Sequence, residues 1–561
     1  MVMSPWNNPT TLTRTWCVFE VYASVVENAR FEIALGRSQK ACFLQDFQNE
    51  GAFKQMLSTI QSEKSSTTVP SDRDNIFKLI RDEVGFAKLD RMVFEVIEKW
   101  MARTVHQQID QAPCLEKKAA WLLVKADFLQ EHGEFAASME TCQAAVNIYR
   151  QDLQDQSSDT WKAQTLLAAL KFDEGHPREE WEPLLQESLV KQIRLLSKDH
   201  ADTLATMHHL GHCYGSICEY DLGLSFLMEC FERQRRVLGE ENLQTRNTMS
   251  QIAVFLSEKG KLEEALEWNL RCFAIQRRIL GDDHPETSRI RNNVGVAYTK
   301  LGDFASGAEH ITACCEVYRR TLGPEHPKTL TIQANEGDSY RLLGDYTTAE
   351  KLLLDCLKHD HHFEHMKAHC LRYLGLVYLG MKDYNRAMSV YQEALDRLAA
   401  VHGRSHAYYT RALPAMFVIK MNSGCFELLE EIDTFETELD HASWTKDIWK
   451  DVSCHGCRSE IHGLLYHCSE CPPQSLRFCQ DCIALNKPAT FCKHGADAIA
   501  FLKPPSRYLQ EKRLDILAKK SDWQKYETHF VAYVNYCDEN QIAKDERLTN
   551  QIPTEESSPD N

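Results

Sequence analysis

Seven cysteines are crowded between Cys454 and Cys492, and His494 follows the last of them at a metal-ligand spacing; this is the part of the sequence with the clearest capacity for chemistry. They form three Cys-x2-Cys pairs and one Cys-x-His pair, namely Cys454/Cys457, Cys468/Cys471, Cys479/Cys482 and Cys492/His494. A two-residue gap lets both thiolates of a turn reach the same ion, and the cluster offers enough thiolate and imidazole ligands for two tetrahedral zinc sites. Because every ligand place is then filled, the sequence predicts two structural zinc ions and no catalysis by them.

The segment Ile461 to Cys468 reads IHGLLYHC, and with this spacing the cluster resembles the ZZ-type zinc finger, whose core is I-x-G-x-x-Y-x-C. The resemblance implies interleaved pairs. One ion would be held by Cys454, Cys457, Cys479 and Cys482, and the other by Cys468, Cys471, Cys492 and His494. ZZ fingers usually end in two histidines, and the first of them is Cys492 here. A MYND finger is the alternative, but it places its final histidine before its last cysteine, which is the reverse of the order here.

ZZ fingers that recognise a free protein N-terminus usually carry an acid after the first cysteine and an acidic stretch before the fifth. This sequence has His455 at the first place and PPQSLRF (Pro472 to Phe478) at the second. Neither segment supplies the carboxylates that hold an ammonium group. We therefore expect a folded interaction platform rather than a reader of N-termini.

A 42-residue period organises the middle of the chain. The segments LSKDHADT, LGEENLQT, LGDDHPET and LGPEHPKT begin at Leu196, Leu238, Leu280 and Leu322. Within each period a helix-ending residue, an aromatic residue or leucine, and a small residue recur, and the small residues are Gly223, Ala265, Gly307, Ala349 and Ala387. We interpret the period as a helix hairpin in which the small residue lets the second helix approach the first. One hairpin cannot bury its apolar face alone, so the hairpins must stack.

The period resembles the 42-residue tetratricopeptide repeats (TPRs) of kinesin light chains, whose LG-x-x-HP-x-T and N-L-A-x-x-Y signatures appear here as LGDDHPET and NVGVAY. The resemblance covers Leu115 to Leu413 and implies a mainly α fold, a right-handed superhelical array of TPR helix hairpins. A fifth unit, Tyr373 to Ala387, follows after a shortened linker. GEFAAS (Gly133 to Ser138) marks a diverged upstream repeat, and SGCFELL (Ser423 to Leu429) a terminal one.

Polar residues recur at one position of the first helix in consecutive hairpins. Steps of 42 residues give His209, Gln251, Asn293 and Asn335. Polar side chains at a repeated position of a concave face can hold the backbone of an extended peptide, as the resemblance to peptide-binding repeats implies. The alternative is that these side chains are solvated and bind no ligand.

The first hundred residues have a different pattern. TRTWCVFEVY (Thr13 to Tyr22) resembles the Ser/Thr-x-x-Trp-Cys-x-x-Glu helix of TIR-like domains, in which the glutamate matching Glu20 serves NAD cleavage in the active members. Few residues precede the motif, so the strands and loops of a nucleotide site are missing, and we expect either a truncated domain or an incomplete chain start. We favour an amphipathic helix with Trp16 and Phe19 buried and Glu20 in solvent, followed by a short strand at Phe31 to Leu35.

Composition excludes several function classes. The formal charge of −17 and the pI near 5.8 argue against nucleic-acid binding, which needs a basic face. No apolar run of membrane-spanning length and no signal peptide occur, so we expect a cytoplasmic protein without membrane insertion. The histidine tract at His359 to His365 lies in the shortened linker and is interpreted as a solvated loop. No P-loop, Gly-x-Ser-x-Gly, His-Glu-x-x-His or kinase signature indicates an enzyme.

The predicted organisation is a truncated TIR-like α/β segment (1–104), a TPR array (115–435), a ZZ-like zinc finger (451–505), C-terminal helices (506–540) and a disordered tail (541–561). We predict a non-enzymatic scaffold that binds proteins or peptides through its repeats. The sequence leaves the oligomeric state open. The alternative is a signalling or innate-defence receptor with a degenerate TIR-like effector segment, for which we expect no NAD cleavage.

Overall fold

The computed structural model describes residues 13–27, 29, 32–36, 39, 42–44, 62–67, 70–83, 86–132, 134–152, 158–359 and 364–552. The chain divides into two compact units. Unit 1 comprises Met1–Ala297 and Ala313–Thr329, and unit 2 comprises Tyr298–Thr312 and Leu330–Asn561. Both are mainly helical, as predicted. Among the described residues, no helix has the length and apolar character needed to cross a membrane.

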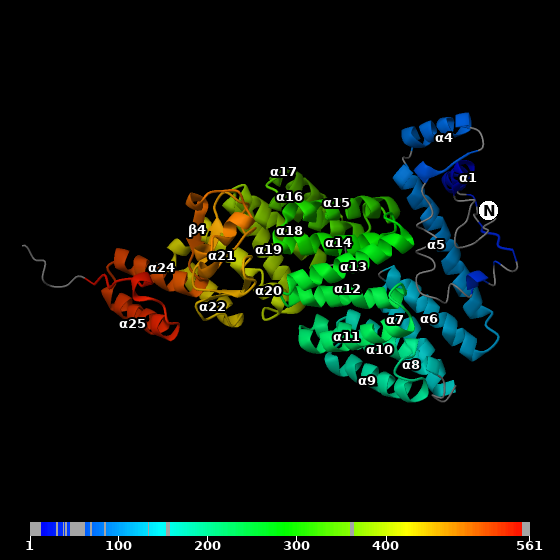
Figure 1. Cartoon of the computed structure of the whole chain (residues 1–561), viewed down its shortest axis with the longest axis horizontal. Helices are drawn as coiled ribbons and strands as arrows, with labels where there is room; N and C mark the ends of the chain where they lie inside the picture. The colour runs from blue at the N-terminus through cyan, green and yellow to red at the C-terminus, as the bar shows by residue number, and fades with distance from the viewer. Residues whose placement is uncertain are drawn as a thin grey trace, which may run out of the picture. The chain divides into compact units, whose positions relative to one another are not determined.

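Unit 1 begins with helices that precede the repeats and continues with stacked helix hairpins (Figure 1). The first group is α1 (Thr15–Val26), η2 (Ser62–Lys64), α4 (Pro70–Glu83) and α5 (Phe86–Asp110). The hairpins are four pairs of helices: α6 (Leu115–Glu131) with α7 (Phe135–Asn147), α8 (Ser158–Asp173) with α9 (Arg178–Leu195), α10 (Ala201–Ser216) with α11 (Tyr220–Val237), and α12 (Leu243–Glu258) with α13 (Leu262–Leu280). Helix α7 continues into η3 (Ile148–Asp152). The repeat pattern in the sequence did not predict the pair α8/α9, in which Gly175 adopts a positive φ at the turn.

Three further helices contribute residues to both units, namely α14 (Pro285–Leu301), α15 (Phe304–Thr321) and α16 (Pro327–Leu342). Unit 2 continues with α17 (Tyr346–Lys358), α18 (Glu364–Gly380), α19 (Tyr384–His402), α20 (Ala407–Thr410), α21 (Leu413–Asn422), η4 (Cys425–Glu427) and α22 (Leu429–His441). A small region of short strands follows, and α24 (Pro505–Lys519), α25 (Trp523–Glu539) and η7 (Lys544–Glu546) come last. The predicted terminal repeat corresponds to α21 and α22.

The repeated signature caps the helices. The Nδ1 atom of His284 accepts a hydrogen bond from the Glu286 N–H at 3.0 Å, and so satisfies a donor at the start of α14 that has no partner within the helix. Pro285 and Pro327 begin α14 and α16, at a helix position where the missing N–H costs nothing. The preceding helix α13 ends at Leu280, and the next residue, Gly281, has a φ of +84° that favours glycine.

The small residue of each hairpin lies where the two helices cross. At Gly223 a Cβ atom would lie 2.7 Å from the Gly215 nitrogen and 2.8 Å from the Gly211 oxygen, so only glycine fits. Ala349 occupies the same place in α17 and is fully buried. The neighbouring aromatic residue, Tyr346, fills the space beside Gly380, where a Cβ atom would lie 2.4 Å from its Cε1. The predicted close approach of the paired helices is therefore confirmed.

Cysteines recur in the second helix of the hairpins at the same 42-residue step, and those at Cys230, Cys272, Cys314 and Cys356 are all buried. The thiol of Cys230 donates to the Leu204 carbonyl oxygen at 3.2 Å. Burial raises the pKa of Cys272 to about 11. These residues act as small apolar side chains.

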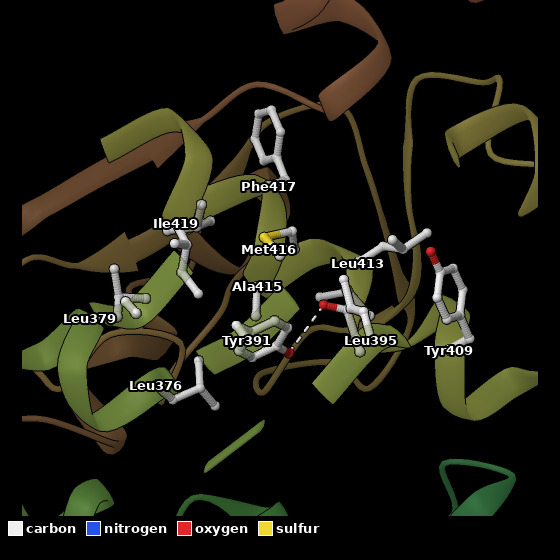
Figure 2. Close-up of a cluster of buried hydrophobic side chains, with 14 of the residues drawn as sticks. Leu376, Leu379, Tyr391, Leu395, Tyr409, Leu413, Ala415, Met416, Phe417 and Ile419 are labelled. Carbon is white, nitrogen blue, oxygen red and sulfur yellow. Dashed lines mark hydrogen bonds between the residues drawn. The ribbon is translucent and has the colours of Figure 1, made fainter. Parts of the chain in front are cut away.

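The core of unit 2 runs from the last repeats into the C-terminal region. Figure 2 shows how α18, α19 and α21 meet around Tyr391, whose hydroxyl donates to the Ala412 carbonyl oxygen at 3.1 Å. Phe417, on α21, contacts Trp449 and Tyr508, with ring centroids 5.9 and 5.3 Å away. One apolar core therefore joins the repeats to the segments that follow them.

A buried ion pair holds the C-terminal helices. Arg507 on α24 is 1% exposed, and its Nε donates to Asp447 Oδ1 at 2.9 Å. Its Nη1 donates to Glu546 Oε2 at 2.8 Å, and the Tyr536 hydroxyl donates to Asp447 Oδ1 at 3.2 Å. Removing one partner of such a network leaves an uncompensated buried charge.

Part of the predicted disordered tail is ordered. Ile542 is buried, and the Leu548 N–H donates to the Tyr533 hydroxyl at 3.0 Å. The Gln551 N–H donates to the Tyr526 hydroxyl at 3.1 Å. Residues 541–552 therefore pack on α25, and the prediction of disorder from 541 onward was wrong for this stretch. The remainder of the tail lies outside the described residues.

We expect Ala349→Trp to lower the free energy of unfolding by roughly 1–3 kcal/mol, because the indole cannot fit where α16 and α17 cross. Thermal unfolding of the full chain, followed by far-UV circular dichroism, measures the loss. Thr347→Trp is the matched control, since Thr347 is exposed on the same helix. An equal effect of the two substitutions would show that the assigned helix crossing is wrong.

Candidate metal centre and peptide-binding face

Two short antiparallel sheets position the cysteine cluster in unit 2. Strand β1 (Ile448–Ser453) pairs with β2 (Glu460–His462), and β3 (Leu465–Cys468) pairs with β4 (Ile499–Leu502). The turn between β1 and β2 carries the first Cys-x2-Cys pair, and the start of α23 (Gln480–Ala484) carries the third. The second pair lies at the end of β3, and the last pair lies in the segment before β4. The first pair is thus brought next to the third, and the second pair next to the last.

The first group consists of Cys454, Cys457, Cys479 and Cys482, whose sulfur atoms all lie within 4.8 Å of one another. The Sγ atoms of Cys457 and Cys479 are 3.7 Å apart. The backbone N–H groups of Gly456 and Cys479 each donate to Cys454 Sγ at 3.3 Å. A Cβ atom on Gly456 would lie 2.7 Å from Cys482 Sγ, so the turn needs glycine to admit all four sulfurs.

The second group consists of Cys468, Cys471, Cys492 and His494, whose ligand atoms also lie within 4.8 Å of one another. The Nδ1 atom of His494 is 3.3 Å from Cys468 Sγ and 3.4 Å from Cys471 Sγ. The structure therefore brings the eight predicted side chains together in the two interleaved groups that the ZZ resemblance implies.

The donor atoms fit zinc. A tetrahedral ion with Zn–S bonds of about 2.3 Å holds its sulfur ligands about 3.8 Å apart. The measured separation of 3.7 Å between Cys457 and Cys479 is close to that spacing. Sets of four sulfurs, or of three sulfurs and one nitrogen, are those of structural zinc sites. Such an ion would supply cross-links between distant segments, with no open coordination place.

His455 stands where N-terminus-reading fingers carry an acid, and the structure buries it. Its Nδ1 accepts a hydrogen bond from the Arg477 N–H at 3.1 Å, and its ring lies between Phe478 and Phe491. Burial lowers the pKa of His455 to about 3, so the imidazole is neutral. A buried neutral ring offers no counter-charge to an ammonium group.

The segment 448–502, which carries the cysteine cluster and is called the finger below, is docked on the repeats of unit 2, which the sequence did not predict. Arg341, at the end of α16, is 4% exposed, and its Nη1 donates to the Pro473 carbonyl oxygen at 3.1 Å. At the turn between α14 and α15, a Cβ atom on Gly302 would lie 2.9 Å from the Phe491 ring. Arg458 donates to the Leu301 carbonyl oxygen at 3.4 Å. The finger is thus part of the folded unit rather than a tethered module.

Three of the four predicted peptide-binding residues lie in unit 1, on the first helices of consecutive hairpins. His209 on α10, Gln251 on α12 and Asn293 on α14 are each half-buried. Gln251 forms a hydrogen bond with His212, and Asn293 Nδ2 donates to Ser250 Oγ at 3.3 Å. Burial lowers the pKa of His209 to about 4, so this side chain is neutral. Asn335 is half-buried on α16 in unit 2.

Arg289, on the same helix as Asn293, was not predicted from the sequence. Its Nε donates to Glu286 Oε2 at 3.0 Å, and its Nη1 donates to Ser250 Oγ at 3.2 Å. Its Nη2 donates to Asn247 Oδ1 at 3.4 Å. Arg289 lies 42 residues after Asn247, so following polar residues at this second position of the repeat could have revealed Arg289 from the sequence.

The N-terminal segment differs from its predicted burial. The buried residues of α1 are Thr15, Val18 and Val21, whereas Trp16 is 44% exposed and Phe19 is half-buried. The expectation that Trp16 is buried was wrong, because the helix packs through the side that carries the two valines. Glu20 is exposed, as expected. The described residues of the predicted strand, 32–35, contain a single bridge residue and no strand, while Phe31 lies outside the described residues.

Most of the histidine tract also falls outside the described part of the chain. Residues 360–363 are not described, and α18 begins at Glu364. The predicted solvated loop therefore stays a prediction.

Comparisons with known proteins identify the repeats. Residues 202–269, 244–318 and 292–360 match one model of the tetratricopeptide repeat, and residues 368–408 match a second. The chain therefore contains tetratricopeptide repeats in this region. No curated protein matches the sequence.

Solved structures resemble parts of the chain. A Podosopora anserina protein described as a kinesin light chain with nearly identical TPR-like repeats is 23% identical, with 36% of this chain and 96% of that chain covered and a TM-score of 0.32. BtubC (BKLC) from P. vanneervenii is 18% identical, with 41% and 90% covered and a TM-score of 0.33. The Cut9–Hcn1 structure of the APC/C is 13% identical, with 76% and 80% covered and a TM-score of 0.43. With TM-scores this low, the identification rests on the repeat models and the hairpins.

We expect the purified full chain to hold two zinc ions, and Gly456→Ala to hold about one, because the added methyl group displaces Cys482 Sγ from the first group. Elemental analysis per mole of protein measures both values. Gly495→Ala should keep two ions, since no atom lies within 4 Å of its added Cβ. Two ions in the Gly456→Ala protein would contradict the assigned first group.

Proposed function

We propose, from the tetratricopeptide repeats at residues 202–408, that this chain is a non-enzymatic scaffold that binds extended peptide segments of other proteins. The observation that carries the proposal is the polar column on the first helices of consecutive hairpins. His209, Gln251 and Asn293 are half-buried and can form hydrogen bonds. Residues of this kind can hold peptide backbone groups while leaving much of the ligand sequence free to vary.

The environment of the column supports a neutral, hydrogen-bonding face. His208 and His209 are both neutral at physiological pH, since burial lowers the pKa of each. The guanidinium of Arg289 is compensated by Glu286, 3.0 Å away. Recognition here would therefore depend on hydrogen bonds to the peptide backbone more than on ion pairs. Asn335, the fourth predicted residue, lies in unit 2 and stays a separate prediction.

We propose that the C-terminal finger is a ZZ-like structural element with two zinc ions. The eight ligand residues fit the ion, and both groups consist of side chains that converge from separate turns. A domain of this size gains much of its stability from bound metal. Its role in the scaffold is to complete the C-terminal end of the repeats on which it packs.

The receptor alternative receives no such support. The matched repeat models begin at residue 202, so they do not cover the TIR-like segment. Glu20 is exposed on α1, and none of the contacts described for that helix forms a nucleotide site. We therefore do not propose an effector function for this segment.

The peptide-binding function can be tested with a display library of short random peptides selected on the zinc-loaded full chain. We expect the double variant Gln251→Ala/Asn293→Ala to bind the selected peptides roughly tenfold more weakly in fluorescence polarisation, because each lost hydrogen bond weakens binding. Gln143→Ala, an exposed amide on the second helix of another hairpin, is the matched control. Equal affinity for all three proteins would reject the proposed face.

A further inference from the structure

The segments of the finger that contact the repeats lie directly beside the proposed metal ligands in the chain. The loop Pro472–Arg477 joins Cys471, in the second group, to Cys479, in the first. Pro473 in this loop accepts the hydrogen bond from Arg341 at 3.1 Å. Leu476, in the same loop, is buried in the core shared with the repeats. Both ends of the contacting loop are therefore fixed by ligand cysteines.

The other two contacts have the same relation to the ligands. Phe491 directly precedes Cys492 and packs beside Gly302, and Arg458 directly follows Cys457 and donates to the Leu301 carbonyl oxygen. The Arg458 guanidinium also lies 5.9 Å from the centre of the Phe491 ring. Arg458 lies beside a ligand of the first group, and Phe491 lies beside a ligand of the second. Both contact the turn at Leu301 and Gly302, so the position of one relative to the other depends on both metal sites.

The rest of the finger is anchored in a different way. Trp449 on β1 is fully buried, and its Nε1 donates to the Gly463 carbonyl oxygen at 3.2 Å. Trp449 packs against Phe417 of α21. The part of the finger around Trp449 is thus held by apolar burial rather than by the cysteine and histidine ligands. Loss of metal should therefore first release the ligand-bearing layer, meaning Pro472–Arg477, Arg458 and Phe491, because the metal ligands fix the turns that carry these residues.

We propose that the finger is a metal-dependent lock on the repeats: bound metal holds Pro472–Arg477, Arg458 and Phe491 against Leu301, Gly302 and Arg341, and loss of metal uncovers this surface. This inference rests on the proposed zinc sites and does not depend on the peptide-binding face. Release of the loop would remove the Pro473 carbonyl oxygen that accepts from Arg341 Nη1. The ion pair between Arg341 Nε and Asp338 Oδ1, at 2.7 Å, would stay. The uncovered surface thus gains a guanidinium donor for a carbonyl or carboxylate of another protein segment.

Hydrogen exchange of the full chain, read by mass spectrometry with and without a zinc chelator, tests the lock. We expect chelation to speed exchange at residues 298–304 and 338–342 roughly tenfold, with less effect on β1. Unchanged exchange at these positions after metal removal would overturn the proposal. Elemental analysis of the starting protein is measured in parallel, and a chain that holds no metal would overturn both the zinc sites and the lock.

Two matched glycine variants test the lock without removing metal. Gly302 and Gly344 occupy the same turn in successive hairpins, with φ of +92° and +86°, so alanine strains both backbones alike. A Cβ atom would meet Phe491 at 2.9 Å only at Gly302, and no atom lies within 4 Å of it at Gly344. We expect Gly302→Ala to keep two zinc ions and to speed exchange of residues 472–477, and Gly344→Ala to leave this loop unchanged. Equal exchange of the loop in the two variants would overturn the proposal.

Discussion

The close approach of two helices at one small residue is the constraint on which the rest of the structure depends. A Cβ atom at Gly223 would lie 2.7 Å from a backbone nitrogen of the facing helix, and Ala349 is fully buried at the equivalent crossing. Because the crossing fixes the distance between the helices, the turn and caps around it recur at a fixed spacing. The stacked hairpins then present the first helix of each pair in the same way, which places polar residues such as Gln251 and Asn293 at equivalent positions.

The same packing continues into the C-terminal region of unit 2. Phe417 on α21 contacts both Trp449 of the finger and Tyr508 of α24, so a single apolar core passes from the repeats into the finger. The buried pair of Arg507 and Asp447 then fixes the last helices. In this arrangement the finger does not need a large core of its own. Its ligand-bearing layer is the exception, because its contacts with Arg341 and Gly302 come from turns that the proposed metal ions would hold.

The sequence predicted the features that local spacing controls. The repeat period located the helix crossings, and the Cys-x2-Cys pairs, with the ZZ resemblance, indicated the two groups that converge. Features that depend on tertiary packing were missed or wrong. Trp16 lies on the exposed side of α1 because the helix packs through the opposite side, which carries Val18 and Val21. Residues 541–552 read as polar, yet Ile542 and the Tyr533 hydroxyl hold them on α25. Docking of Phe491 at Gly302 has no signal in a single sequence, because both residues belong to turns whose relative position only the fold defines.

We propose that the tetratricopeptide array holds an extended segment and that metal completes the finger. In this proposal the eight clustered side chains hold two zinc ions in sulfur-rich sites. Zinc K-edge X-ray absorption of the full chain tests this claim directly, because it reports the ligand atoms themselves. With Cys454, Cys457, Cys479 and Cys482 on one ion, and Cys468, Cys471, Cys492 and His494 on the other, we predict seven sulfur ligands and one nitrogen ligand over the two ions, with Zn–S distances of about 2.3 Å. A first shell dominated by nitrogen and oxygen would contradict it.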